Sequence, residues 1–83
     1  INERKDQSSK NSYVVSLLNK GVKEIAKKVT EEAGEASIAA VTNDGRLIEE
    51  SADLLFHLIV LLKDQNYSLV DVLDELKRRS SNQ

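Results

Sequence analysis

The chain has 83 residues, enough for one domain at most, and its 14 acidic and 12 basic side chains give a net charge of −2. This charge balance argues against a general nucleic-acid binder. With no cysteine and a single histidine, the chain excludes disulfides, thiolate metal sites and multi-histidine zinc sites. Any bound metal must therefore have oxygen ligands, which favours Mg²⁺ or Mn²⁺.

The composition also bounds the fold and the location of the protein. No stretch is long enough to span a bilayer and no signal peptide is visible, so we expect a cytoplasmic protein without a membrane partner. The absence of proline and the low aromatic content are typical of an all-helical chain. We expect residues 1–83 to form one all-α domain, and because the chain starts at Ile1 rather than Met, we expect residues upstream of it to be missing.

The N-terminal third predicts a loop followed by a short helix. Residues 6–11 are polar and rich in serine, asparagine and lysine, which indicates a loop. Ser12 is a candidate N-cap for a helix over 13–19, and Gly21 stands where a glycine commonly ends a helix.

A second helix is predicted over 22–41, where apolar residues recur at steps of three and four. Its N-terminal half and the residues before it are basic, with Lys20, Lys23, Lys27 and Lys28. Gly34 lies in its interior and costs roughly 1 kcal/mol relative to alanine. A glycine there suggests close approach of a neighbouring helix or of a ligand.

Two further helices follow. After a turn over 42–45, a helix over 46–64 contains the run 54–62, which is apolar nearly all round. A helix that is apolar on every side is buried on every side, and because so small a domain cannot enclose it, we infer a homodimer. A last helix over 69–79 is predicted from Ser68 and Asp71, which have the spacing of a capping box.

Acidic residues cluster on the second and third helices. At about 100° per residue, Glu35 falls between Glu31 and Glu32, and in the same way Asp53 falls between Glu49 and Glu50. The short turn makes the two helices antiparallel neighbours, so their acidic faces can meet. Like charges at this spacing repel, and a bound cation would relieve that repulsion. Spacing alone leaves a shared cation site and two solvated acidic surfaces equally open.

The acidic pattern resembles the metal motif of the MazG-like all-α nucleotide pyrophosphohydrolases, with Glu31-Glu32-x-x-Glu35 followed by Glu50-x-x-Asp53. The surrounding sequence is similar to the phosphoribosyl-ATP pyrophosphohydrolase family of histidine biosynthesis, over nearly the whole chain. The motifs that carry this likeness are Ser12-Tyr13, Leu17-Leu18-x-Lys20-Gly21, Lys27-Lys28-Val29, residues 52–62 and Asp71-Val72-Leu73.

The sequence departs from the family pattern at three points. Thr30 stands where the family often has glycine, Gly34 is a less usual residue inside the acidic motif, and the family's first helix is mostly absent. None of these departures removes an acidic residue of the motif. In many organisms the family's domain is fused behind a cyclohydrolase domain, and the sequence does not exclude that origin here.

The resemblance implies a fold, an activity and a set of site residues. The fold is a MazG-like helical bundle of four to five helices, completed as a homodimer. The activity is Mg²⁺-dependent hydrolysis of phosphoribosyl-ATP to phosphoribosyl-AMP and pyrophosphate, the second step of histidine biosynthesis. The implied metal ligands are Glu32, Glu35, Glu50 and Asp53, while Glu31 completes a second metal position or orients the attacking water. Glu49 has no match in the motif and is expected to be a surface residue.

The substrate is a polyanion, so the basic residues Lys20, Lys23, Lys27 and Lys28 are the expected phosphate contacts. An ordinary solvated base is the alternative for any single lysine, but Lys20 and Lys28 lie within matched motifs. Tyr13 either stacks on the adenine or packs within its helix. His57 either hydrogen-bonds a metal ligand or is a satisfied histidine of the dimer core.

Two other functions remain open. One is a house-cleaning nucleoside triphosphate pyrophosphohydrolase of the MazG type, although Ser12-Tyr13 and Lys20-Gly21 favour phosphoribosyl-ATP. The other is a non-catalytic helical dimerisation module. A di-iron carboxylate bundle is excluded, because that site needs two Glu-x-x-His pairs and this chain has one histidine.

Overall fold

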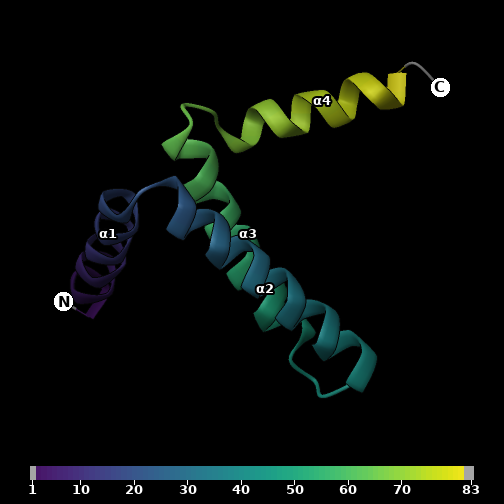
Figure 1. The fold of residues 1–83 in the computed structure, drawn as a ribbon, viewed down its shortest axis with the longest axis horizontal. Helices are drawn as coiled ribbons and strands as arrows, with labels where there is room; N and C mark the ends of the chain where they lie inside the picture. Colours follow the sequence, from purple (N-terminus) through teal and green to yellow (C-terminus); the bar gives the residue numbers. More distant parts are fainter. Residues whose placement is uncertain (1, 82–83) are drawn as a thin grey trace.

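A computed structural model describes residues 2–81, with side-chain environments for residues 11–81. Its four helices are α1 (Asn2–Lys20), α2 (Val22–Thr42), α3 (Leu47–Asp64) and α4 (Leu69–Ser81). All the regular structure in this range is helical, which confirms the predicted all-α class. None of the helices within residues 2–81 has both the length and the apolar character of a membrane span. As Figure 1 shows, α2 and α3 lie side by side, α1 packs near one end of this pair, and α4 extends away from it.

Helix α1 corrects the prediction for the N-terminal third. The loop expected over 6–11 and the helix start expected at Ser12 are wrong, because α1 runs without a break from Asn2. The segment contains no glycine or proline, and serine and asparagine cost at most about 0.7 kcal/mol each in a helix interior. Gly21 ends α1 as expected, with its N–H donating to the Leu17 carbonyl at 3.3 Å and a φ of 94° that suits glycine.

The turn between α2 and α3 makes the two helices antiparallel. Asn43 adopts a left-handed conformation with φ of 53°, and its N–H donates to the Ala39 carbonyl. Gly45 also has a positive φ, of 82°, and the Asp44 carboxylate accepts the Arg46 N–H at 2.9 Å. The predicted bounds of both helices agree with the observed ones to within one residue.

A small core joins the first three helices. Leu17, Ile25 and Val60 are buried, one from each helix, and the partly buried residues that pack against them are Val14, Leu18, Phe56 and Leu61. Along the rest of α2 the buried residues are Ala36 and Ala39, so little apolar volume stabilises that part of the hairpin.

Two expectations about packing have different outcomes. Among the residues that the structure describes, no atom that could obstruct a Cβ built at Gly34 lies within 4 Å of it, so no helix of the same chain makes the close approach suggested there. In contrast, the apolar run of α3 is only partly covered, as the prediction of a partner requires. Leu55 is 46% exposed and Ile59 is 39% exposed, whereas the buried residues of the run are His57 and Val60.

Replacing Ile25 by alanine tests the core. Ile25→Ala removes a fully buried side chain at the junction of three helices and should lower the free energy of unfolding by about 2–5 kcal/mol. Urea denaturation measures this change. The matched control is Ile48→Ala at an exposed position, where we expect a much smaller loss. Equal losses for the two variants would contradict the placement of the core.

Candidate active site

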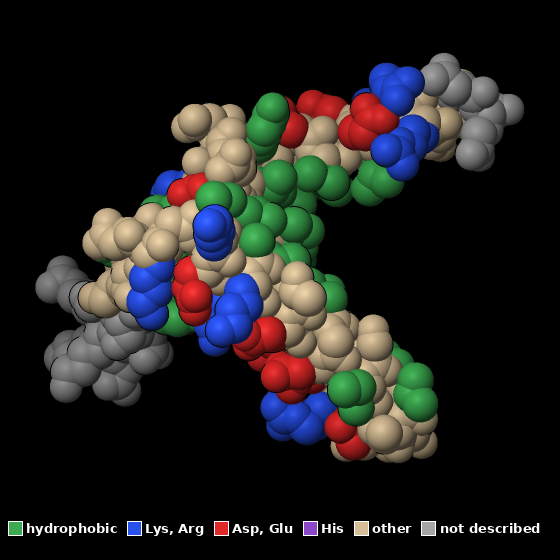
Figure 2. All heavy atoms as spheres, in the orientation of Figure 1, with side chains coloured by type: hydrophobic (Ala, Val, Ile, Leu, Met, Phe, Trp, Pro, Cys, Tyr) green, Lys and Arg blue, Asp and Glu red, His purple; other side chains and the backbone are tan. Residues whose placement is uncertain are grey.

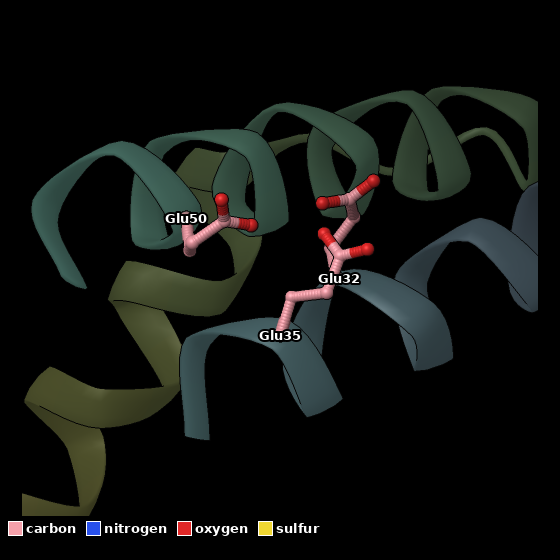
Figure 3. Close-up of side chains that lie close together, drawn as sticks. All are labelled: Glu32, Glu35 and Glu50. Carbon is pink, nitrogen blue, oxygen red and sulfur yellow. The ribbon is translucent and has the colours of Figure 1, made fainter. Parts of the chain in front are cut away.

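Three carboxylates meet between α2 and α3. Glu32 and Glu35 lie three residues apart on α2, which places them on the same side of the helix, and Glu50 lies in the first turns of α3. Each offers one carboxylate oxygen, and these oxygens all lie within 4.8 Å of one another. Figure 3 shows the three side chains extending from the two helices into the space between them.

Two oxygens of this cluster are buried without a partner. Glu50 is only 8% exposed and Glu32 is half-buried. Within the described part of the chain, neither Oε2 of Glu32 nor Oε2 of Glu50 accepts a hydrogen bond. A buried charged oxygen without a partner is costly, and three carboxylates so close together repel one another. A divalent cation would relieve both costs, so the residues present fit an oxygen-ligated Mg²⁺ or Mn²⁺.

Arg46 is a residue of this cluster that the sequence analysis missed. Its guanidinium donates to Glu50 Oε1 at 3.0 Å and pairs with Glu49 Oε2 at 3.0 Å. The hydrogen bond with Glu50, followed by the charges of Glu49 and Glu50, raises the pKa of Arg46. Arg46 therefore holds one oxygen of Glu50, while the other, Oε2, is buried without a hydrogen-bond partner among the described residues. The spacing of four residues between Arg46 and Glu50 was the available sequence signal.

The remaining acidic residues of the motif lie outside the cluster. Asp53 is exposed on α3, one turn beyond Glu50, and does not belong to the group of converging oxygens. Glu31 is exposed on α2, with its carboxylate 4.0 Å from Nζ of Lys27. Glu49 is exposed as well, in agreement with the surface position expected for it. The roles of Asp53 and Glu31 at a metal remain predictions.

Tyr13 and His57 form a hydrogen-bonded link from α1 to α3. The Nδ1 atom of His57 lies 2.8 Å from the Asp53 carbonyl, and its Nε2 lies 2.7 Å from the Tyr13 hydroxyl. A carbonyl only accepts, so Nδ1 carries a proton, and with that tautomer Nε2 accepts the O–H of Tyr13. The Tyr13 ring also stacks on Phe56, with ring centroids 6.0 Å apart. This geometry favours the packing role of Tyr13 and the satisfied-histidine role of His57, here within a single chain.

The four lysines lie near the junction of α1 and α2. Lys28 is half-buried, while Lys20, Lys23 and Lys27 are exposed. In Figure 2 basic and acidic side chains adjoin one another along the hairpin. Lys20 also borders an open hollow of about 580 Å³ on α1, whose described lining residues are Asn11, Ser12, Val15, Ser16, Asn19 and Lys20. Positive charge thus lies beside the acidic cluster, as a polyanionic substrate would require.

Tyr13→Phe tests the link between α1 and α3. The variant removes the O–H that His57 accepts and leaves a buried ring nitrogen without its donor, so we expect a loss of about 1–2 kcal/mol in the free energy of unfolding. Chemical denaturation measures it. Tyr67→Phe, at an exposed tyrosine, is the matched control and should change stability little. A Tyr13→Phe variant as stable as the control would show that the hydrogen bond contributes nothing.

Comparison with known proteins identifies the family. Residues 1–80 match the profile of the family described as phosphoribosyl-ATP pyrophosphohydrolase. The chain is 50% identical over 80 residues to the phosphoribosyl-ATP pyrophosphatase of Zymomonas mobilis, covering 95% of this chain and 75% of that protein. It is 47% identical over 79 residues to the phosphoribosyl-ATP pyrophosphatase of Listeria welshimeri, covering 95% and 77%.

One longer relative is named as a bifunctional protein. The chain is 49% identical over 82 residues to the histidine biosynthesis bifunctional protein HisIE of Buchnera aphidicola, covering 98% of this chain and 40% of that protein. The chain therefore spans less than half the length of this bifunctional relative and about three quarters of the other two. On the matches to the family profile and to these relatives, the chain belongs to the phosphoribosyl-ATP pyrophosphohydrolase family.

Proposed function

We propose that this chain hydrolyses phosphoribosyl-ATP to phosphoribosyl-AMP and pyrophosphate, with Mg²⁺, in the cytoplasmic pathway of histidine biosynthesis. The observation that carries the proposal is the cluster of Glu32, Glu35 and Glu50, with two buried oxygens that no described residue satisfies. Membership of the family supplies the substrate, since its members are named for phosphoribosyl-ATP.

Four carboxylates would hold the metal in this proposal. Glu32, Glu35 and Glu50 already converge, and a change of side-chain rotamer brings Asp53, one turn from Glu50, towards them. When bound, Mg²⁺ supplies charge neutralisation at the phosphate oxygens, which carboxylates by themselves would repel. Arg46 keeps Glu50 oriented by holding its Oε1 atom.

The reaction transfers the nucleotidyl group of the substrate to water. A water oxygen forms a bond to the α-phosphorus, the bond from that phosphorus to the bridging oxygen breaks, and pyrophosphate leaves with the bonding electrons. Glu31, the motif acid exposed beside the cluster, orients this water, and a carboxylate takes up its proton. Because the chain between Gly21 and Glu31 carries three of the four lysines, the substrate phosphates lie towards the α1 end of the hairpin. There the phosphate contacts are Lys20, Lys23, Lys27 and Lys28, while Tyr13 keeps the packing role that its hydrogen bond to His57 favours.

The same proposal includes a homodimer. The chain has a radius of gyration of 15.1 Å, whereas a compact domain of this length has one of about 12 Å. The run of α3 that should be buried on all sides leaves Leu55 and Ile59 exposed. A second copy that covers this face would give α3 the environment its sequence requires. A chain that sediments as a monomer at micromolar concentration would contradict the dimer.

Adjacent glutamates provide a matched test of the site. Glu50→Gln should reduce pyrophosphate release from phosphoribosyl-ATP by at least about 100-fold, because loss of a ligand exceeds the 10–100-fold cost of an outer-shell change. Glu35→Gln and Asp53→Asn should be equally damaging. Glu49→Gln, at the exposed neighbouring position, should retain activity within a few fold.

This assay has two outcomes that would overturn parts of the proposal. Near-normal activity of Asp53→Asn would remove Asp53 from the ligand set and leave the three converging glutamates. A folded wild-type protein that releases no pyrophosphate from phosphoribosyl-ATP, but releases it from common nucleoside triphosphates, would replace the substrate. Each variant is compared with the wild type at equal concentration and matched helical content by circular dichroism.

Thermal melting with Mg²⁺ tests the metal without an activity readout. A cation that binds only the native state at 100 times its Kd stabilises it by about 2.7 kcal/mol, which raises Tm by roughly 10 °C or more for a domain of this size. Glu50→Gln should lose most of this shift, and NaCl at equal ionic strength should not reproduce it. Identical melting curves with and without Mg²⁺ would instead favour a non-catalytic helical module.

A further inference from the structure

Arg46 contacts Glu50 through both its backbone and its side chain. The Arg46 carbonyl accepts the Glu50 N–H at 2.9 Å, and the Arg46 guanidinium donates to Glu50 Oε1 at 3.0 Å. On the other side, the Asp44 carboxylate accepts the Arg46 N–H at 2.9 Å and fixes the backbone. Arg46 is therefore held at the start of α3, directly beside the most buried carboxylate of the cluster drawn in Figure 3.

Two glutamates fix the guanidinium at the same time. Its Nη1 atom lies 3.0 Å from Oε2 of Glu49, while its Nη2 atom lies 3.0 Å from Oε1 of Glu50. A planar guanidinium can serve two carboxylates in this way because its donors have a fixed geometry, which a lysine ammonium lacks. The Arg46 side chain is 55% exposed, so it reaches the buried Glu50 from the solvent side of the cluster.

The stability of α3 does not explain this arrangement. A cation at a helix N-terminus opposes the helix dipole, and a base four residues before an acid has the less favourable orientation for an ion pair. Exposed pairs such as the one between Arg46 and Glu49 contribute at most about 1 kcal/mol. The effect of Arg46 on Glu50 is therefore the feature that calls for a function.

The contact with Arg46 makes the two oxygens of Glu50 unequal. Oε1 lies against a positive charge, whereas Oε2 is buried and accepts no hydrogen bond from any described residue. A cation bound through both oxygens would lie next to the guanidinium, and the two positive charges would repel each other. A cation bound through Oε2 alone leaves the hydrogen bond to Oε1 in place.

Divalent ions differ in how they use a carboxylate. Ca²⁺ takes six to eight oxygen ligands in flexible geometry and often binds both oxygens of one carboxylate. Mg²⁺ is smaller and demands a nearly ideal octahedron, which the narrow spacing of the two oxygens of one carboxylate does not fit. A glutamate limited to one oxygen therefore handicaps Ca²⁺ more than Mg²⁺.

We propose that Arg46 determines the ion specificity of the carboxylate cluster: by holding Oε1 of Glu50, it restricts Glu50 to coordination through one oxygen and so favours Mg²⁺ over Ca²⁺. The inference rests on the proposed function, which supplies the metal site, and adds the residue that discriminates between ions. Arg46 is a positioning residue, because it acts on the ion only through Glu50.

Isothermal titration calorimetry of the full chain with MgCl₂ and, separately, with CaCl₂ tests the inference without an activity readout. The quantity of interest is the Kd for Ca²⁺ divided by the Kd for Mg²⁺. Arg46→Ala should lower this ratio by about 10-fold, at the lower end of the effect of an outer-shell partner, because Ca²⁺ gains the second oxygen of Glu50. A general change in the charge of the site affects both ions and cancels in the ratio.

Two further variants control for charge and for folding. Arg78 pairs with Glu75 three residues away on α4, as Arg46 pairs with Glu49, so Arg78→Ala removes the same charge from the same kind of pair and should leave the ratio unchanged. Arg46→Lys keeps the charge but not the fixed geometry, so its ratio should lie between those of the wild type and Arg46→Ala. Circular dichroism in metal-free buffer verifies that each variant keeps the helical content of the wild type.

The outcomes separate the inference from the proposal on which it rests. If Arg46→Ala changes the Kd of both ions by the same factor, Arg46 affects only the charge or the stability of the site, and the inference is wrong while the metal site stands. If the wild type binds neither ion, both the inference and the metal site are wrong. A ratio that falls in Arg46→Ala and not in Arg78→Ala would support the inference. Hydrolysis of phosphoribosyl-ATP is measured separately and does not enter this test.

Discussion

The antiparallel packing of α3 along α2 is the constraint on which the rest of this structure depends. The left-handed Asn43 and the glycine at position 45 reverse the chain, and the reversal places Glu50 opposite Glu32 and Glu35. Packing in the hairpin thus holds three carboxylates together against their mutual repulsion. In the proposed function a bound divalent cation would offset that repulsion, because each carboxylate would then face a positive charge.

Hydrogen bonds from neighbouring residues position the helices and side chains of the cluster. Arg46 holds the Oε1 atom of Glu50 and so fixes the orientation of this carboxylate, whose Oε2 atom is buried without a partner among the described residues. His57 binds the Asp53 carbonyl and accepts the Tyr13 hydroxyl, which ties α1 to the helix that carries two of the proposed ligands. These contacts position the backbone under the site. Their effect on chemistry is therefore indirect, through the orientation of carboxylates.

The limited core is one reason for proposing a second copy of the chain. Leu17, Ile25 and Val60 form the buried centre, while one face of α3 and the side chains of Leu73 and Leu76 on α4 are left to solvent. A chain of this length buries only about 60% of its unfolded surface even when compact, so it has little stability to spare. In the proposed dimer the partner supplies that missing burial and stiffens the hairpin. Formation of the dimer would therefore also help to hold the three glutamates in place.

The sequence by itself determined the helices from Val22 onwards, because their apolar periodicity, the turn at 43–45 and the Ser68–Asp71 spacing are local signals. It also placed the two acidic clusters on neighbouring antiparallel helices, since helical spacing and a short turn are sufficient for that. The sequence failed to predict the helix over residues 6–11, where polar composition indicated a loop but no residue breaks a helix.

Only tertiary structure decided that Glu32, Glu35 and Glu50 converge while Glu31 and Asp53 lie outside. It also decided that Arg46 joins the cluster and that Tyr13 hydrogen-bonds to His57. Such outcomes depend on side-chain directions and on contacts 44 residues apart, which no local pattern records.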